Sequence, residues 1–495
     1  MRAVTTPQTD QPDPLAARAW PIVVDLDGTL TPTDTLMESV LLAVKHRPAD
    51  LLLLPLWLSE GRAAFKARVA EKVSGLTTGD AWPYRADLLE YLKAEKSRGR
   101  RLVLATAAHR SIADPVALHL GLFESVIASD AKHNLKGHAK LAAIRQRVGA
   151  QFIYAGDSRA DLPIWQASQG AILVDAAAPI ARRLMADGIA IVHEFKRPPL
   201  RFDDWRHALR LHQWLKNSLI FVPLLTAFAF TDLHAVALVI AASLAFSLAA
   251  SATYIGNDLW DLQADRSHPR KKARPFASGR IGIPAGLAVA ALLMLAALAL
   301  ALLLPPGFLA LLLLYVGLTS AYSWVLKSYV LIDVVMLALL YTLRIIAGGA
   351  ASGITVSLWL IGFSIFMFLS LALIKRCAEL VSMQQAGVAS AAGRDYRVGD
   401  LAVLWPMGVG SGLCAVVVFA LFASAPEVAA RYATPALLWL VAVGLIYWLA
   451  RLWIKTARGE MDDDPVVYAI RDFGSRVTVV AMLATVLTAR FIKLG

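Results

Sequence analysis

Residues 257–279 read NDLWDLQADRSHPRKKARPFASG and lie between two long apolar segments of the chain. The stretch holds three acids followed by five bases: Asp258, Asp261, Asp265, Arg266, Arg270, Lys271, Lys272 and Arg274. Carboxylates spaced by three and four residues lie on one side of a helix, and oxygen ligands suit Mg²⁺ that is completed by substrate phosphates. The bases can hold further phosphates. The stretch therefore predicts a membrane-embedded transferase that uses Mg²⁺ and a diphosphate. An ordinary basic loop is the alternative, although it needs no ordered acids.

The composition divides the chain into two halves. Of the 495 residues, 57% are hydrophobic and 17% are charged, and the long apolar runs begin only after roughly residue 200. The net charge of +12 is explained by basic cytoplasmic loops of a membrane protein, so we expect no nucleic-acid partner. Residues 1–19 have no apolar signal-peptide core and predict a disordered tail. Cys377 and Cys414 both lie in apolar segments, so no disulfide framework is expected.

The first half predicts an α/β domain with an open parallel sheet. Three apolar runs end in polar residues: IVVDLDGTL (22–30), RLVLATAAHR (101–110) and FIYAGDSRADL (152–162). Helical segments alternate with these runs, as parallel crossovers require. Ligand sites of such sheets lie at the carboxyl ends of the strands.

These three runs, with a lysine between the second and the third, resemble the four motifs of the haloacid dehalogenase (HAD) superfamily of phosphatases, in order. By that resemblance Asp25 is the nucleophile that forms an aspartyl-phosphate, and Asp27 is the general acid and base. Thr106 would bind the phosphoryl group, and a lysine, Lys140 or else Lys136, would neutralise charge. One Mg²⁺ would be held by Asp25, Asp157 and Asp161, because carboxylates cannot face a phosphate dianion without a cation between them.

The resemblance also implies the domain boundaries. We expect a Rossmann-like HAD domain at 20–193, with a helical cap at about 32–100, and a linker at 194–206 that contains a Pro-Pro pair. The run LLLLPLWL (51–58) is too short to span a bilayer. We expect it to be core of the cap, with a position on the membrane surface as the alternative.

Residues 207–495 predict an all-α bundle of nine transmembrane helices, because each apolar run is near the ~20 residues that a bilayer needs. The expected spans are 214–231, 234–256, 282–304, 307–325, 329–350, 356–376, 401–424, 434–455 and 476–494. Most charges lie in the loops after even-numbered spans. The positive-inside rule then places the N-terminal domain and the candidate chemistry in the cytoplasm, at a bacterial-type inner membrane.

Charged residues inside or beside the spans are further candidates. Asp333 and Arg344 are eleven residues apart, about three helical turns, so they are expected to share a face. Lys327 lies just before them. For Lys375 and Arg376, function and snorkelling at the end of a span are both open.

The pattern NDxxDxxxD with a second polar motif two spans later resembles the UbiA superfamily of intramembrane prenyltransferases, which are bundles of nine helices. The second motif here, YSWVLKSYVLID (322–333), departs from that family because it has one aspartate. With HPRKKARPFASG (268–279), it resembles the branch that contains decaprenyl-phosphate phosphoribosyltransferase. QWLKN, LRIIAGG and KRCAEL also appear in order.

That resemblance implies phosphoribosyl diphosphate as donor and a polyprenyl phosphate as acceptor, and it leaves a homo-oligomer open. One or two Mg²⁺ ions would bind the donor diphosphate through Asn257, Asp258, Asp261 and Asp265, with Asp258, Asp261 and Asp333 as the catalytic acids. Lys271, Lys272 and Arg274 would hold the 5-phosphate of the donor. Lys327, Arg344 and Lys375 would hold the acceptor. The fused phosphatase would then remove the 5-phosphate, giving a lipid-linked pentose for glycan synthesis.

Three other functions stay open. The first is a prenyltransferase that uses prenyl diphosphate and an aromatic acceptor, with a phosphatase of unrelated substrate. The second is a phosphatase that helices only anchor to the membrane. The third is a transporter, although the sequence shows no internal repeat.

Overall fold

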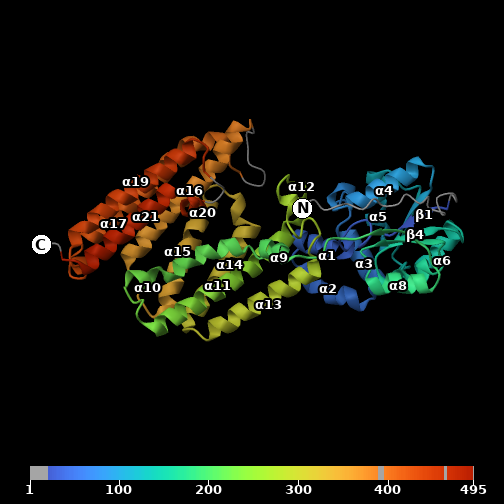
Figure 1. Cartoon of the computed structure of the whole chain (residues 1–495), viewed down its shortest axis with the longest axis horizontal. Helices are drawn as coiled ribbons and strands as arrows, with labels where there is room; N and C mark the ends of the chain where they lie inside the picture. The colour runs from blue at the N-terminus through green and yellow to red at the C-terminus, as the bar shows by residue number, and fades with distance from the viewer. Residues whose placement is uncertain (1–19, 388–394, 462–464, 494–495) are drawn as a thin grey trace, which may run out of the picture. The chain divides into compact units, whose positions relative to one another are not determined.

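The computed structural model describes residues 20–387, 395–461 and 465–493 of the chain, so the predicted tail at 1–19 lies outside the described residues. The chain divides into two compact units, and each is described by itself (Figure 1). The N-terminal unit comprises Met1–Ala208 together with Asp258–Ala288, and the helical unit comprises Leu209–Asn257 together with Val289–Gly495. The aspartate-rich stretch therefore belongs, from Asp258 on, to the N-terminal unit.

The N-terminal unit contains a parallel sheet of six strands in the order β3-β2-β1-β4-β5-β6. The strands are β1 (Ile22–Val24), β2 (Leu102–His109), β3 (Ser125–Ser129), β4 (Ile153–Gly156), β5 (Gly170–Val174) and β6 (Ile191–Phe195). The helices before residue 209 are α1 (Thr35–His46), α2 (Asp50–Ser59), α3 (Arg62–Lys72), α4 (Ala86–Ser97), α5 (Arg110–Leu120), α6 (His138–Arg147), α7 (Leu162–Trp165), α8 (Ala178–Ala186) and α9 (Phe202–Ala208). The predicted α/β class with a parallel sheet is confirmed.

The three strands that carry the motifs form the centre of this sheet. β1 pairs with β2 on one side and with β4 on the other. β1 and β5 are fully buried, as apolar runs covered on both faces require. The chain order reverses between β1 and β4, and an α/β sheet binds its ligands at such a point. The fold thus brings together the polar ends of the runs at 22–30 and 152–162.

The region between the first two motifs is helical, but its parts pack differently. Leu88 and Leu92 of α4 are buried with the strands in the core of the sheet. Leu42 and Ala43 of α1 form a small separate cluster with Val73, the residue that follows α3. The core position expected for 51–58 is wrong for most of α2, because five of its leucines are 40% to 82% exposed. A helix of ten residues with leucines on every side cannot bury them against one neighbour.

The helical unit contains most of eight helices that are long and apolar enough to cross a membrane, counted over the described residues. They are α11 (Leu233–Trp260), α13 (Ile283–Leu302), α14 (Pro306–Trp324), α15 (Ile332–Ser352), α16 (Leu358–Gln385), α17 (Leu401–Ala423), α19 (Leu438–Ala457) and α21 (Phe473–Phe491). The short helices of this unit are α10 (Val222–Thr226), α18 (Pro426–Ala429) and α20 (Pro465–Arg471), and the short helix α12 (Leu262–Ser267) belongs to the N-terminal unit. In Figure 1, α17, α19 and α21 run side by side.

The first expected span, 214–231, is not one continuous α-helix. A 3₁₀ stretch, η3 (Leu211–Phe221), leads into the five-residue helix α10. Pro223 lies in the first turn of α10, where it cannot donate the hydrogen bond that would continue a helix from before. Phe228 has a positive φ of 55°, which ends the helical path. The predicted membrane bundle is therefore confirmed, and eight of the nine expected spans coincide with long continuous helices of the described residues.

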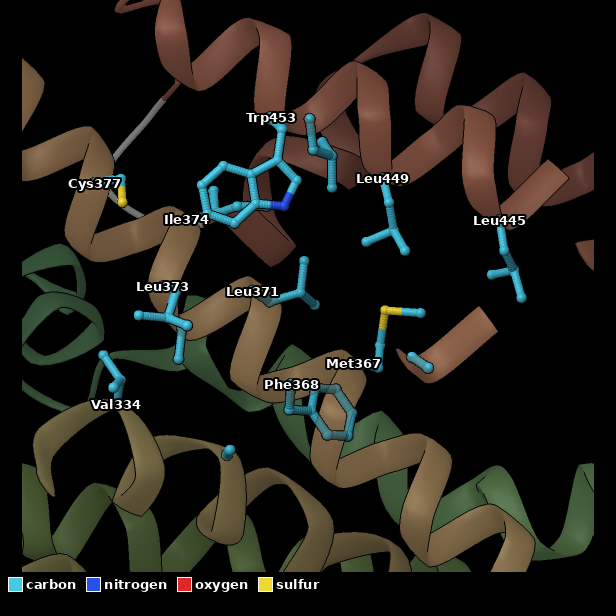
Figure 2. Close-up of a cluster of buried hydrophobic side chains, with 14 of the residues drawn as sticks. Val334, Met367, Phe368, Leu371, Leu373, Ile374, Cys377, Leu445, Leu449 and Trp453 are labelled. Carbon is cyan, nitrogen blue, oxygen red and sulfur yellow. The ribbon is translucent and has the colours of Figure 1, made fainter. Parts of the chain in front are cut away.

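Apolar side chains from several of these helices form the core of the helical unit. Figure 2 shows Met367, Phe368 and Leu371 of α16 between Val334 of α15 and side chains of α19. The labelled α19 residues are Leu445, Leu449 and Trp453. Helix α16 is thus packed between α15 and α19, and it carries charged residues near its end.

Candidate active sites

The first site lies where the central strands of the N-terminal unit end. Asp25 directly follows β1, Asp157 directly follows β4, and Asp161 lies in the short turn η2 (Arg159–Asp161). One oxygen of each of these three carboxylates lies within 4.8 Å of the others. Among the described residues this is the one cluster of three acidic, histidine or cysteine ligands. The sequence-predicted metal set is brought together as expected.

Asp25 and Asp157 are poorly solvated, and this raises their affinity for protons. Burial raises the pKa of Asp25 to about 6, opposed by Lys140 and increased by Asp161. Burial and the charges of Asp25 and Asp161 raise the pKa of Asp157 to about 7. A divalent cation would relieve this repulsion, and hard carboxylate oxygens suit Mg²⁺. The donor set therefore fits one Mg²⁺ held by these three side chains.

Lys140 is the lysine that reaches the carboxylates. Its Nζ lies 2.9 Å from Asp25 Oδ2 and 3.5 Å from Asp161 Oδ1, and it donates to the hydroxyl of Tyr154 at 3.0 Å. Burial lowers the pKa of Lys140, but the two carboxylates more than offset this and hold the pKa above its usual value. Lys136 is exposed and lies at the edge of the same cavity. The geometry thus favours Lys140 for the charge-neutralising role.

Asp27 and Thr106 also lie at this end of the sheet. Asp27 Oδ1 accepts a hydrogen bond from the Thr35 backbone N–H at 2.8 Å. Burial and the charge of Asp34 raise the pKa of Asp27 to about 7, so that its carboxyl can give and take a proton near neutral pH. The hydroxyl of Thr106, on β2, is fully buried and accepts from the Ala108 N–H at 2.9 Å.

Gly28 lets the chain turn tightly between these acids. It has a φ of 75°, and a Cβ there would lie 2.2 Å from Asp157 Oδ2. Only glycine fits this turn without displacing the carboxylate of Asp157.

A cavity of about 430 Å³ opens over the first site. Asp25, Asp27, Lys140, Asp157 and Asp161 line it. Two further parts of its wall were missed by sequence reasoning. Lys66 of α3 reaches it, donating to the Ala107 carbonyl at 2.7 Å and to Asn134 Oδ1 at 3.0 Å. Residues 282–284, which follow the aspartate-rich stretch, are the second part. No local pattern links them to a site formed 121 residues earlier or more, counted from Asp161 to Gly282.

The aspartate-rich stretch forms a second cluster, in which Arg274 joins two of the acids. Arg274 Nη1 lies 3.1 Å from Asp258 Oδ1 and 2.6 Å from Asp265 Oδ2. Both carboxylates are nearly buried. The acids do not share one continuous helix, because α11 ends at Trp260 and α12 begins at Leu262, with Asp261 in the turn between them. Asp258 and Asp265 nevertheless both contact the guanidinium group of Arg274.

Mg²⁺ binding by this segment agrees with its donor atoms. Asp258 and Asp265 supply buried carboxylates that already attract a cation. The side-chain oxygen of Asn257, the preceding residue on α11, is buried and accepts no hydrogen bond from the protein. Lys271 and Lys272, in the 3₁₀ turn η4 (Lys271–Ala273), are exposed, so the structure brings Arg274 to the acids and leaves these two lysines at the surface.

The helical unit contains a buried ion pair that the sequence predicted only in part, since Asp333 was a candidate but its partner Arg376 was left open. Asp333, at the start of α15, pairs with Arg376 of α16 and accepts a hydrogen bond from the hydroxyl of Tyr396. The side chains of Asp333 and Arg376 are 0% and 1% exposed, so snorkelling is excluded for Arg376. Arg376 also pairs with Glu379. The sequence did carry a signal, because a lone aspartate in an apolar span needs a cationic partner.

Arg344 lies in a second buried network of the same unit. It donates to Asn217 Oδ1 at 2.9 Å, to the Leu340 carbonyl at 2.6 Å and to the Tyr315 hydroxyl at 3.2 Å. Asn217, the last residue of QWLKN, is thus the partner that links two of the quoted motifs. Lys327 in η5 (Leu326–Ser328) and Lys375 on α16 are half-buried.

Comparisons with known proteins agree with this division of the chain. Residues 22–166 match the haloacid dehalogenase-like hydrolases, and residues 218–474 match the UbiA prenyltransferase family. An uncharacterized protein of Sinorhizobium fredii, y4nM, is 40% identical over 463 residues, which cover 92% of this chain and 88% of that protein. The nodulation protein NoeC of Azorhizobium caulinodans is 34% identical over 281 residues, covering 57% of this chain and 91% of its own length.

A more distant relative has a named activity. Decaprenyl-phosphate phosphoribosyltransferase of Mycobacterium tuberculosis is 34% identical over 186 residues, which cover 37% of this chain and 62% of that enzyme. The alignment therefore spans less than two thirds of that enzyme. A solved UbiA homolog from Archaeoglobus fulgidus, bound to GPP and Mg²⁺, aligns with 57% of this chain at 17% identity and a TM-score of 0.43.

The fold and the sites define a multi-pass membrane enzyme with an N-terminal phosphatase-type domain. The chain belongs to the UbiA prenyltransferase family, and its N-terminal part is a haloacid dehalogenase-like domain. The predicted families and their fusion in one chain are confirmed.

Proposed function

We propose that this chain is a bifunctional enzyme that makes a lipid-linked pentose in two steps. Its membrane domain transfers 5-phosphoribose from phosphoribosyl diphosphate to a polyprenyl phosphate. Its HAD domain then removes the 5-phosphate. The observation that carries the proposal is the aspartate-rich stretch, which places buried acids and a row of bases within one segment of the compact unit that holds the phosphatase-type site.

The proposed donor explains why the aspartate-rich stretch needs both acidic and basic side chains. Phosphoribosyl diphosphate carries a diphosphate and a separate 5-phosphate. Mg²⁺ held by Asn257, Asp258, Asp261 and Asp265 would neutralise the leaving diphosphate. Arg274, with Lys271 and Lys272, would bind the 5-phosphate. A prenyl diphosphate donor has no second phosphate and would leave these bases without a ligand.

In the transfer step an oxygen of the polyprenyl phosphate attacks C1 of the ribose. The bond between C1 and the diphosphate breaks, and the diphosphate leaves with the electron pair. The acceptor oxygen is already anionic, so no strong base is needed. We assign Lys327, Arg344 and Lys375 to the acceptor phosphate, and Asp333 to the catalytic machinery through its contact with Arg376. Relatives named decaprenyl-phosphate phosphoribosyltransferase support this choice of substrates.

In the hydrolysis step Asp25 attacks the phosphorus of the 5-phosphate and forms an aspartyl-phosphate. Asp27 protonates the leaving ribose oxygen and then takes a proton from the water that releases phosphate. Lys140 lies 2.9 Å from the nucleophile, where it neutralises charge on the phosphoryl group. Bound Mg²⁺ would supply further charge neutralisation, and Asp25, Asp157 and Asp161 are the residues to hold it.

Both steps are proposed to take place on the cytoplasmic side of a bacterial-type inner membrane. Basic residues are concentrated in loops on one side of the spans, and the positive-inside rule assigns that side to the cytoplasm. Phosphoribosyl diphosphate, a soluble anion, is available there.

The donor is tested with membranes that contain the full chain, Mg²⁺ and two labelled donors in separate reactions. We expect label from phosphoribosyl diphosphate to enter the lipid fraction when a polyprenyl phosphate is present, and we expect Asp258→Asn to abolish this. Consumption of labelled prenyl diphosphate with an aromatic acid, and no labelled ribose in lipid, would establish an aromatic prenyltransferase instead.

A further inference from the structure

The aspartate-rich stretch is fixed to the phosphatase domain by a buried ion pair. Arg266 of α12 makes two parallel contacts with Glu38 of α1, at 2.6 Å and 2.7 Å. It also donates to the Ala81 carbonyl at 3.0 Å and to the Ala277 carbonyl at 2.9 Å. The two side chains are only 9% and 6% exposed. Paired guanidinium and carboxylate groups of this kind give a defined geometry as well as energy.

Gly279, at the end of the stretch, makes a second close contact with the same domain. It has a φ of 70°, and a Cβ there would lie 2.8 Å from Pro32 and 2.9 Å from Thr33. Its carbonyl accepts a hydrogen bond from Arg197 at 3.0 Å. Lys45 of α1 donates to the Trp260 carbonyl at 2.8 Å. The segment is thus held before, within and after its row of bases.

The residues that follow Gly279 then form part of the phosphatase cavity. Gly282, Ile283 and Pro284 line the same space of about 430 Å³ as Asp25 and Lys140. Ile283 is also the first residue of α13, a candidate membrane span. One wall of the phosphatase site is therefore the point at which the chain enters its third expected span.

We propose that residues 279–284 are a substrate-selecting wall of the phosphatase and that the Arg266–Glu38 pair holds this wall in position. The inference rests on the phosphatase step of the proposed function. Ile283 and Pro284 add apolar side chains to a cavity that is also lined by the acids and Lys140. With the phosphoryl group at the acids and Lys140, we expect the organic group of a phosphomonoester to contact this apolar part of the lining. Arg266 itself does not line the cavity. It is a positioning residue, because it affects the substrate only by holding residues 279–284 in place.

The wall is tested on the full chain in lipid nanodiscs with Gly282→Trp. A Cβ at Gly282 would meet only Pro284 Cδ, at 3.9 Å, so a side chain can be added at this cavity-lining position without a backbone clash. We expect KM for ribose 5-phosphate to rise about tenfold or more with a smaller change in kcat. Leu287→Trp is the matched control, because Leu287 lies one turn further along α13, is 47% exposed and does not line the cavity.

The role of Arg266 is tested by hydrogen–deuterium exchange, which needs no activity. Arg266→Met is expected to speed exchange of the amides at 276–284 about tenfold or more, because local opening sets that rate. Arg270→Met, at an exposed base of the same stretch, is expected to leave it unchanged. Arg266→Lys should restore part of the protection of these amides.

The outcomes separate the two proposals. If the wild type hydrolyses ribose 5-phosphate and the KM is equal in Gly282→Trp and Leu287→Trp, the proposal that residues 279–284 select the substrate is overturned. Unchanged exchange in Arg266→Met overturns the role of the ion pair. No hydrolysis of any phosphomonoester by the wild type overturns the phosphatase step itself.

A different observation carries a second inference, on helix α2. Leu51, Leu52, Leu53, Leu56 and Leu58 are 40% to 82% exposed, whereas Trp57 is buried. The ten-residue helix is about 15 Å long, too short to span a bilayer. Exposed arginines flank both of its ends, Arg47 before and Arg62 after.

We infer that α2 lies on the membrane surface with its leucines in the interface between head groups and acyl chains. The bilayer is the partner that we propose for these leucines. Two candidate membrane spans have one end in the N-terminal unit, because α11 ends there and α13 begins there. Apolar side chains with flanking bases favour an interfacial position over anionic lipid. Such an anchor would keep the phosphatase site beside a lipid-borne substrate.

Collisional quenching tests this position. A fluorophore is attached to Leu52→Cys in the full chain with Cys414→Ser, reconstituted in nanodiscs that contain nitroxide-labelled phosphatidylcholine. We expect the lipid nitroxide to quench position 52 at least about threefold more than Leu118→Cys, an equally exposed leucine on α5. Equal quenching at both positions, or protection of position 52 from both lipid-borne and water-soluble quenchers, would overturn the anchor.

Discussion

At the scale of single residues, the two lysines of the first site show what only the fold can decide. Lys136 and Lys140 are four residues apart, and both are compatible with the motif order. Gly137, with a φ of 56°, separates Lys136 from the start of α6, and only Lys140 points to Asp25. The acids were easier to predict, because each directly follows an apolar strand.

We predict that Lys140→Met lowers kcat for phosphomonoester hydrolysis about 100-fold or more, because an uncompensated carboxylate then faces the phosphate. Lys136→Met should cost less than about tenfold, since Lys136 does not contact the acids. Steady-state hydrolysis by the full chain measures both. Similar losses in the two variants would contradict the assignment of Lys140.

The buried pair of Asp333 and Arg376 gives a second prediction at this scale. Arg376→Met leaves an uncompensated carboxylate inside the helical unit and should cost about 3–5 kcal/mol of stability. Asp333→Asn combined with Arg376→Met should recover part of this loss. Thermal unfolding of the protein in detergent checks it, with the half-buried Lys375→Met as control. A double variant no more stable than the single one would argue against the pair.

At the scale of elements, sequence patterns predicted a helix correctly where the whole segment lies in a single apolar environment. Eight of the expected spans coincide with helices, because some twenty apolar residues have few other options. The patterns failed for 214–231 and for α2, both short or proline-containing apolar runs. Hydrophobicity alone does not say whether such a run is covered by protein or lipid.

Packing between α16, α17 and α19 depends on one large side chain. Trp453 of α19 donates to Ser370 at 3.2 Å, and a Cβ at Gly408 of α17 would lie 2.2 Å from its ring. We predict that Trp453→Ala costs about 3–5 kcal/mol, because the cavity cannot collapse onto a glycine. Thermal unfolding tests the loss. KM for ribose 5-phosphate should stay unchanged, because Trp453 lies in the other compact unit; a changed KM would contradict this independence.

At the scale of the whole molecule, the sequence predicted two domains but not how the chain divides between them. Residues 258–288 comprise the end of α11, the start of α13 and the stretch between these two candidate spans, yet they pack with the N-terminal unit. That contact depends on single pairs such as Arg266 and Glu38, which are 228 residues apart and leave no periodic signal. Long-range pairs of this kind follow from the fold and cannot be read from local spacing.

Metal removal is predicted to stop both activities of the full chain. The acids of each site need a cation to face phosphate groups, so EDTA should abolish lipid labelling and hydrolysis, and added Mg²⁺ should restore both. The two activities are assayed separately. Hydrolysis that persists after chelation would contradict the metal role of Asp25, Asp157 and Asp161.

The central claim is that two successive steps occur in one chain, and the Asp25→Asn variant tests it most directly. Membranes with the wild type or with the variant receive labelled phosphoribosyl diphosphate, a polyprenyl phosphate and Mg²⁺, and the extracted lipid is analysed for the 5-phosphate. We predict labelled lipid without the 5-phosphate from the wild type, and accumulation of the 5-phosphorylated lipid in Asp25→Asn. The same lipid product from both would contradict the account.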